Sequence, residues 1–158
     1  MPIPEALQEH PNAVALAALA VTGKFDRGEL TLEVEPSNII AALEKAKHSL
    51  GFERLSTVTG VDRYPAEPRF EVVYHMQSVS KPAASDARLR LKIRLPGENP
   101  EVESATPVYR SANWYERETF DLFGINFLNH PNLTRIMLPA DWEGHPLRKD
   151  VPVTGTRY

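Results

Sequence analysis

The stretch from residue 87 to residue 96, ARLRLKIRLP, alternates apolar and basic side chains without a break. Leucine or isoleucine occupies the odd positions from 89 to 95, and arginine or lysine occupies the even positions from 88 to 94. Successive side chains of a β-strand point to opposite faces of the sheet. The pattern therefore predicts a strand that has one buried face and one exposed face.

Further segments carry the periodicity or the residue types of regular elements. Strands are predicted for three more stretches, which alternate or are rich in β-branched residues: 29–35, 52–62 and 69–79. Helices are predicted for 5–20, 37–50, 101–109 and 113–123, with Ser37 as an N-cap and with Gly51 and Gly124 as stops. The expected fold class is α+β, a two-layer arrangement with a mostly antiparallel sheet of about four strands and helices packed on it.

Composition excludes several kinds of site. The 158 residues suit one domain, or one domain with a tail, and they include no cysteine. Thiol nucleophiles, zinc thiolate sites, disulfides and iron–sulfur clusters held only by cysteine are therefore excluded. The longest wholly apolar run, residues 13–21, is far shorter than the ~20 residues of a membrane-spanning helix. No basic segment typical of a signal peptide opens the chain. We expect a soluble intracellular chain.

The basic face of strand 88–95 could be a ribbon that binds nucleic acid. No aromatic side chain is interleaved on that face to stack on bases, and the net charge of the chain is -3. The acidic side chains of strand 29–35 are a ready complement, since opposite charges on neighbouring strands attract. We therefore favour cross-strand pairing or solvation of this face, followed by a protein docking surface, and place nucleic acid last.

The stretch from residue 113 to residue 124, NWYERETFDLFG, mixes four charges with large apolar side chains. On a helix, Arg117 and Asp121 form an i,i+4 pair, and Glu118 shares the face of Asp121. Glu116 follows Asn113 by three residues, which fits a variant of the capping box. Because charges inside an apolar helix must pair, we interpret the group as a partly buried network that fixes the helix against another segment. The arginine-bearing C-terminal segment is the candidate.

A metal site is the alternative for these carboxylates. The residues of the right type are Glu116, Glu118, Asp121, His130 and His145. No helix carries Glu-x-x-His, the pattern of di-metal sites in helix bundles, and both histidines precede proline, which favours an extended backbone. A stand-alone carboxylate or metal enzyme is thus the rival reading from a different functional class.

Residues 130–158 are expected to form an extended C-terminal tail beside an α+β domain of residues 1–129. The tail has no helical or strand period, and it contains prolines at 131, 139, 146 and 152. Its apolar side chains must cover either its own domain or a partner. Trp142, Arg135 and Arg148 are of the residue types that dominate protein interfaces, so we favour docking on a partner.

From residue 115 to residue 150 the sequence YERETFDLFGINFLNHPNLTRIMLPADWEGHPLRKD resembles the signature of the C subunit of the proton-pumping NADH:quinone oxidoreductase, respiratory complex I. The resemblance extends over roughly residues 52 to 151. The residues that we expect to form this signature and an interface are Glu116, Arg117, Glu118, Asp121, His130, Pro131, Arg135, Trp142, His145, Arg148 and Asp150.

The resemblance implies a non-catalytic component of the peripheral arm that has no cofactor of its own. FMN and the iron–sulfur clusters, which carry electrons from NADH to quinone, would belong to partner subunits. The chain would lie against the D subunit and near the B subunit, on the cytoplasmic side of a bacterial inner membrane. Equivalent subunits occur in a related photosynthetic complex and in membrane-bound hydrogenases. Since the sequence stops at Tyr158, we expect the free-standing form of the C subunit.

Overall fold

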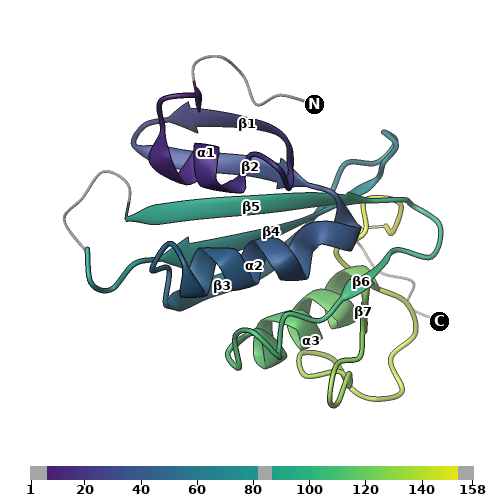
Figure 1. Cartoon of the computed structure of the whole chain (residues 1–158). Coiled ribbons are helices and arrows are strands. Elements are labelled where there is room, and N and C mark those ends of the chain that lie inside the picture. Colours follow the sequence, from purple (N-terminus) through teal and green to yellow (C-terminus); the bar gives the residue numbers. More distant parts are fainter. Residues whose placement is uncertain (1–6, 82–86, 153–158) are drawn as a thin grey trace.

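A computed structural model describes residues 7–81 and 87–152 of the chain. Its main sheet has five strands in the order β1-β2-β5-β4-β3, and β6 and β7 form a second, two-stranded sheet (Figure 1). The strands are β1 (Ala20–Asp26), β2 (Glu29–Val34), β3 (Arg54–Asp62), β4 (Phe70–Gln77), β5 (Arg88–Leu95), β6 (Glu101–Glu103) and β7 (Asn126–Leu128). The helices are α1 (Pro11–Leu16), the 3-10 turn η2 (Pro36–Asn38), α2 (Ile39–His48) and α3 (Ala112–Phe123).

Strand β5 lies at the centre of the main sheet, as its alternation predicts. It pairs parallel to β2 and antiparallel to β4. Its odd-numbered side chains are all buried in the core: Leu89, Leu91, Ile93 and Leu95. The predicted α+β class with a mostly antiparallel sheet is confirmed, since β2 and β5 are the single parallel pair among the described strands of the main sheet.

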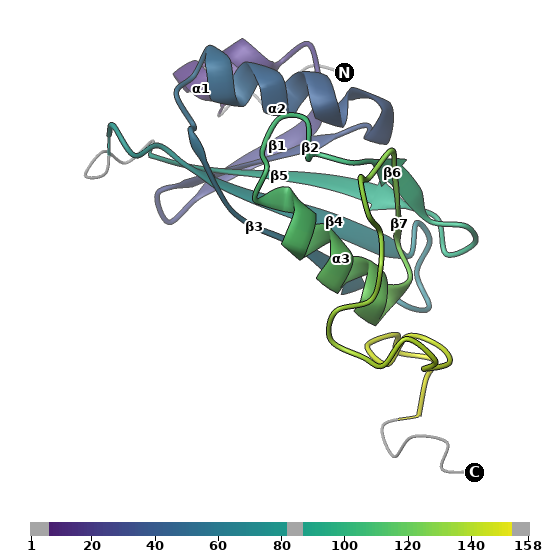
Figure 2. The same ribbon diagram turned by 90° about the horizontal axis from the view of Figure 1, so that it is seen from below.

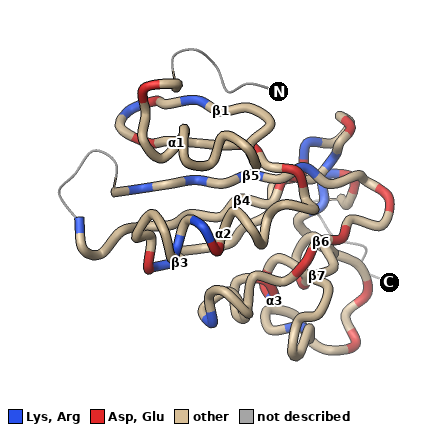
Figure 3. Tube along the Cα trace, viewed as in Figure 1, with Lys and Arg blue, Asp and Glu red and all other residues tan. Residues whose placement is uncertain are grey.

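The opposite face of the sheet carries ion pairs between strands. Each basic side chain of β5 lies within 3.1 Å of a carboxylate on a neighbouring strand: Arg88 and Arg90 on Glu29, Lys92 on Glu71, and Arg94 on Glu33. The basic positions follow one another along β5 in Figure 3. Such pairs contribute roughly 0.2–1 kcal/mol each. Cross-strand pairing, the favoured interpretation of this face, is confirmed.

The helices cover one side of the sheet and one of its edges. Both α1 and α2 lie on the same side (Figure 2), and α2 buries Leu43 and Ala46 in the core. Helix α3 packs on the edge strand β3. There Thr119 Oγ1, which donates to the carbonyl of Tyr115 at 2.8 Å, lies 3.4 Å from the carbonyl of Val58, and Gly60 leaves room for the ring of Phe123. An edge covered in this way is protected from pairing with another chain.

One predicted helix is shorter than expected, and another is absent. The helix expected at 5–20 is confined to α1 in the described residues, because the chain from Ala20 onward pairs with β2 as an additional strand. The helix expected at 101–109 is absent, because Glu101–Glu103 pairs with β7 and Ala105 donates its N–H to a side chain. Tertiary contacts override local helix propensity in both places.

The ends of α2 agree only in part with the sequence. Ser37 is not the N-cap; that position is held by Asn38, whose side chain makes no capping hydrogen bond. Gly51 has a φ of +76°, which suits a residue that ends a helix. No helix in the described ranges, 7–81 and 87–152, has the length and apolar character needed to span a membrane.

Candidate functional site

Helix α3 ends where the C-terminal segment, residues 130–152, folds back on it. Gly124 has a φ of +73°, and its N–H donates to the carbonyl of Phe120 at 2.8 Å. A Cβ atom at Gly124 would lie 2.5 Å from the His145 ring and 2.6 Å from the Arg148 guanidinium. Glycine is therefore needed here both for its backbone conformation and for the close approach of the segment. Gly124 as the end of the helix is confirmed.

Asp121, on the last turns of α3, is the first anchor of the segment. Its side chain is fully buried, and its Oδ1 accepts a hydrogen bond from Arg135 Nη1 at 2.6 Å. Its Oδ2 accepts three backbone N–H groups at 3.0, 2.7 and 3.0 Å, those of Ile136, Met137 and Leu138. Burial opposes ionisation of this carboxyl, but the hydrogen bonds outweigh burial and hold its pKa below the ordinary value.

The predicted partner of Asp121 is wrong, and the predicted role of the network is confirmed for Asp121 and Arg117, which fix the helix against the C-terminal segment. Arg117 does not pair with Asp121. Its Nε donates to the carbonyl of Thr134 at 3.0 Å, its Nη2 donates to Thr134 Oγ1 at 2.9 Å, and its guanidinium lies over the ring of Trp114. Asp121 points into the protein, where Arg135 reaches it from the segment. The helix is thus fixed to the arginine-bearing segment, as expected.

The free carbonyl groups at the end of α3 form the second anchor. His145 Nδ1 donates to the carbonyl of Asp121 at 2.9 Å, and Arg148 Nε donates to that of Phe123 at 2.6 Å. The N–H of Leu147 donates to the carbonyl of Leu122 at 3.1 Å. The last carbonyls of a helix have no partner within it, so this segment completes the helix end. Burial is the main cause that lowers the pKa of His145 below its ordinary value.

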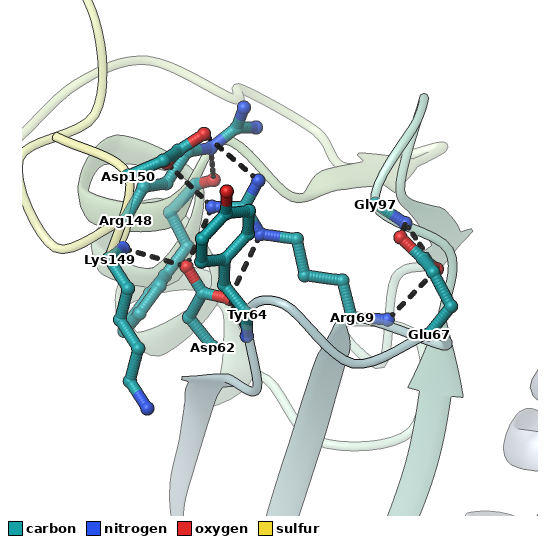
Figure 4. A network of polar contacts seen from close by, with 9 residues as sticks. Asp62, Tyr64, Glu67, Arg69, Gly97, Arg148, Lys149 and Asp150 are labelled. Carbon is teal, nitrogen blue, oxygen red and sulfur yellow. Dashed lines mark hydrogen bonds and ion pairs between the residues drawn. The ribbon is translucent and has the colours of Figure 1, made fainter.

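Arg69 is the third anchor, at the end of the main sheet (Figure 4). Its Nη2 donates to Asp62 Oδ2 at 2.8 Å and to Asp150 Oδ1 at 2.6 Å, so the side chain joins β3 to the segment. Asp62 also accepts the N–H of Lys149 at 2.8 Å. Hydrogen bonding to Arg69 is the main cause that holds the pKa of Asp62 well below its usual range, against the effect of burial.

Glu116 and Glu118 do not have the roles that the sequence suggests. The capping box is wrong, because Glu116 is fully buried and accepts hydrogen bonds from Ser104 Oγ and from the N–H of Ala105, each at 2.6 Å. The N-cap of α3 is Ser111, without a capping hydrogen bond from its side chain. Glu118 is half-buried, and within the described part of the chain its carboxylate has no hydrogen bond or ion pair.

His130 and Pro131 begin the segment next to α3. The Nδ1 atom of His130 accepts the N–H of Asn132 at 3.0 Å, and its Nε2 lies 3.2 Å from the carbonyl of Asn113. Pro131 is exposed. Across residues 7–81 and 87–152 no group of three or more histidine, aspartate and glutamate side chains is placed to hold a metal ion.

The segment has two kinds of apolar side chain. Leu133, Ile136 and Leu138 are half-buried, and Leu133 packs against the core. Three others are exposed, at 60%, 49% and 51% respectively: Met137, Trp142 and Leu147. The later part of the segment lies at the end of α3 that points away from α1 and α2 (Figure 2), whereas His130 contacts Asn113 at the start of the helix. It is therefore tied to its own domain by buried polar groups, while large apolar side chains remain on its outer surface.

The family described as respiratory-chain NADH dehydrogenase, 30 Kd subunit, matches residues 32–157 of the chain. The chain belongs to this family. Among its relatives, the C subunit of the NADH-quinone oxidoreductase of Citrifermentans bemidjiense is 45% identical over 129 residues, which are 82% of this chain and 78% of the relative. The C subunit of the Roseiflexus castenholzii enzyme is 47% identical over 138 residues, 86% of this chain and 76% of the relative.

Two solved structures resemble this member of the 30 Kd family. A trypsin-resistant fragment (1-134) of Nqo5 is 32% identical with a TM-score of 0.61, over 70% of this chain and 88% of the fragment. A chain of the membrane-bound sulfane sulfur reductase, an archaeal respiratory membrane complex, is 28% identical with a TM-score of 0.72, over 91% of this chain and 79% of that chain. The fold is therefore shared with subunits of respiratory assemblies.

Sequence reasoning about this family member missed Asp62 and Arg69. Asp62 ends β3 and Arg69 directly precedes β4, which pairs antiparallel with β3, and the N–H of Arg63 donates to the carbonyl of Arg69 at 2.8 Å. The signal that could have found them is the short connection between two predicted strands, which brings opposite charges at their ends together. Their link to Asp150 has no local signal, because it joins positions 81 residues apart.

Proposed function

We propose that this chain is a cofactor-free, non-catalytic structural component in the peripheral arm of NADH:quinone oxidoreductase. That complex passes electrons from NADH through FMN and iron–sulfur centres to quinone and couples the reaction to proton translocation. The redox groups belong to other subunits, and the chain docks on the D subunit near the B subunit. Support comes from its membership of the 30 Kd family and from relatives named as the C subunit of NADH-quinone oxidoreductase.

The two-sided C-terminal segment is the observation that carries the docking role. Its inner side is held by the three anchors Asp121, Arg69 and the end of α3. Its outer side exposes Met137, Trp142 and Leu147. A rigid, preorganised surface loses less conformational entropy on binding than a loose one, and buried aromatic side chains commonly dominate the affinity of interfaces.

The partners in turn determine where the chain resides. We place it peripherally on the cytoplasmic side of a bacterial inner membrane, where it is held by the assembled complex. The likeness to a chain of the membrane-bound sulfane sulfur reductase favours a second candidate, the equivalent position in a related membrane complex. The outer side of the segment would serve the same purpose there. The identity of the bound partners distinguishes the two.

Purification of the tagged full-length chain from detergent-solubilised membranes tests the docking role. We expect the D and B subunits to co-purify with the wild-type chain, as identified by mass spectrometry. Trp142→Ala should lower their recovery several-fold and leave the melting temperature of the free chain nearly unchanged, because Trp142 is 49% exposed. Phe25→Ala is the matched control, since Phe25 is 46% exposed on β1, outside the segment.

Two outcomes count against the docking role. If Trp142→Ala recovered as much of the D and B subunits as the wild type, the outer side of the segment would not be the interface. If the wild-type chain brought down subunits of a hydrogenase or a photosynthetic complex in place of an NADH-linked one, the second candidate would replace the first.

A further inference from the structure

Glu116 is a buried carboxyl group, and no lysine or arginine nitrogen of the described residues lies within 4.0 Å of its oxygens. Its side chain is 0% exposed, and its two hydrogen-bond donors are the neutral Ser104 hydroxyl and the Ala105 N–H. Among the described residues, the one imidazole nitrogen within 4.0 Å of the Glu116 carboxylate is His130 Nε2, which lies 3.8 Å from Glu116 Oε2. An ionised carboxylate in such a place is costly unless a positive charge compensates it.

His130 does not supply that positive charge. Its Nδ1 accepts a hydrogen bond from the N–H of Asn132 at 3.0 Å, so the lone pair of Nδ1 is occupied. The ring proton must then reside on Nε2, where it is donated to the carbonyl of Asn113 at 3.2 Å. Burial, with a smaller effect from Arg117, lowers the pKa of His130 below its ordinary value, against the hydrogen bond to Asn113. The imidazole is therefore neutral at pH 7.

The polar groups that β4 and the connection before α3 bring near Glu116 are uncharged. From β4, the fully buried Tyr74 approaches it, and the Tyr74 hydroxyl has no hydrogen-bond partner among the described residues. Burial raises the pKa of Tyr74, and the Glu116 carboxylate raises it further, so this phenol stays protonated. From the connection between β6 and α3 come the Ser104 and Thr106 hydroxyls. The strands on which α3 packs, β3 and β7, likewise bring no lysine or arginine nitrogen of the described residues within 4.0 Å of Glu116.

A pair of hydroxyl groups leads from Glu116 to the partly exposed residue Thr106. Ser104 Oγ lies 2.6 Å from Glu116 Oε2 and 2.8 Å from Thr106 Oγ1, and Thr106 is half-buried. When Glu116 is ionised, Ser104 donates its proton to Oε2. When Oε2 carries a proton, it can donate to Ser104 Oγ, and Ser104 turns its own proton toward Thr106 Oγ1. Either state keeps the Ala105 N–H on Oε1, so no heavy atom needs to move.

We propose that Glu116 is a buried proton-binding site, which takes up one proton from solvent and releases it through the hydroxyls of Ser104 and Thr106. Burial is the main cause that raises the pKa of Glu116 to about 7, against the hydrogen bonds from Ser104 and Ala105. The folded chain then binds this proton more tightly than the unfolded chain does. Its contribution to stability is complete below about pH 4.5 and is lost as the pH rises to about 7.

A carboxyl ¹³C NMR titration of the full-length chain, from about pH 4 to about pH 9, tests this site. Glu116→Gln assigns the resonance, and the amide signal of Ala105 reports the same titration in the wild type should that variant fail to fold. We expect a midpoint within about one unit of 7. Asp121 is the internal control, because its pKa is lowered and its resonance should not titrate in this range.

The variant Thr106→Val tests whether the hydroxyl groups of Ser104 and Thr106, and not burial alone, determine the titration midpoint of Glu116. It removes the acceptor that Ser104 uses when Glu116 is protonated, so it should lower the midpoint of Glu116. The proposal would be overturned if the Ala105 amide signal and the Glu116 carboxyl resonance both titrated below about pH 5.5. It would also be overturned if neither signal changed over the whole pH range. An unchanged midpoint in Thr106→Val would overturn the hydroxyl path.

Discussion

At the scale of single residues, Asp121 accepts more hydrogen bonds from the C-terminal segment than any other described residue outside it. Its four side-chain hydrogen bonds all come from donors 14 to 17 residues further along the chain. Three of them are backbone N–H groups, which would otherwise need water or another acceptor. The carboxylate thus determines the path of the backbone from Arg135 to Leu138 as well as pairing with one arginine.

Asp121→Asn should destabilise the full-length chain. The variant removes the negative charge beside Arg135 and puts an N–H₂ or an uncharged oxygen where three N–H groups converge. Breaking a buried ion pair on one side typically costs about 3–5 kcal/mol. Denaturant unfolding measures the loss. Glu118→Gln on the same helix is the control, and we expect it to stay within about 0.5 kcal/mol of the wild type. Equal stabilities for Asp121→Asn and Glu118→Gln would mean that the network contributes nothing.

At the scale of elements, the sequence predicts best those elements that are formed by interactions between residues close together in the chain. Strand β5 is predictable because the alternation in its own sequence shows which side chains face the core and which face away from it. The connection at 104–106 is not, because the Ala105 N–H is taken by Glu116, 11 residues away. Helix α3 is predicted correctly from its own sequence. The partners of its charges are wrong for Arg117 and Glu116, because they lie in other segments.

Gly124→Ala should loosen the contact between α3 and the segment. Gly124 and Gly28 both have positive φ, +73° and +77°, so alanine at either position meets a strain of roughly 1–2 kcal/mol. Only at Gly124 would the new Cβ also clash, with His145 and Arg148. Hydrogen exchange by mass spectrometry should therefore show faster exchange at Ile136–Leu138 in Gly124→Ala and not in Gly28→Ala. The same exchange in both variants would show that the segment does not depend on this close approach.

At the scale of the whole molecule, the sheet and α3 form a platform that presents the segment. The sequence predicts the α+β class and marks most residues of the candidate site. The signature residues Asp121, Arg135, His145, Arg148 and Asp150 do come together around the end of α3 and the end of the sheet. The sequence could not show that these residues bind their own domain, since their contacts join distant positions. The division at residue 129 stays a prediction, and residues 153–158 lie outside the described part of the chain.

The central claim is that the outer side of the segment is a docking surface whose inner side is anchored within the chain. Hydroxyl-radical footprinting of the free chain and of the membrane-assembled complex tests it most directly. Met137 and Trp142, exposed at 60% and 49%, should react readily in the free chain and lose most of their reactivity in the complex. Phe25, exposed at 46%, is the control and should react equally in both samples. Met137 and Trp142 that react equally in both samples would contradict the account.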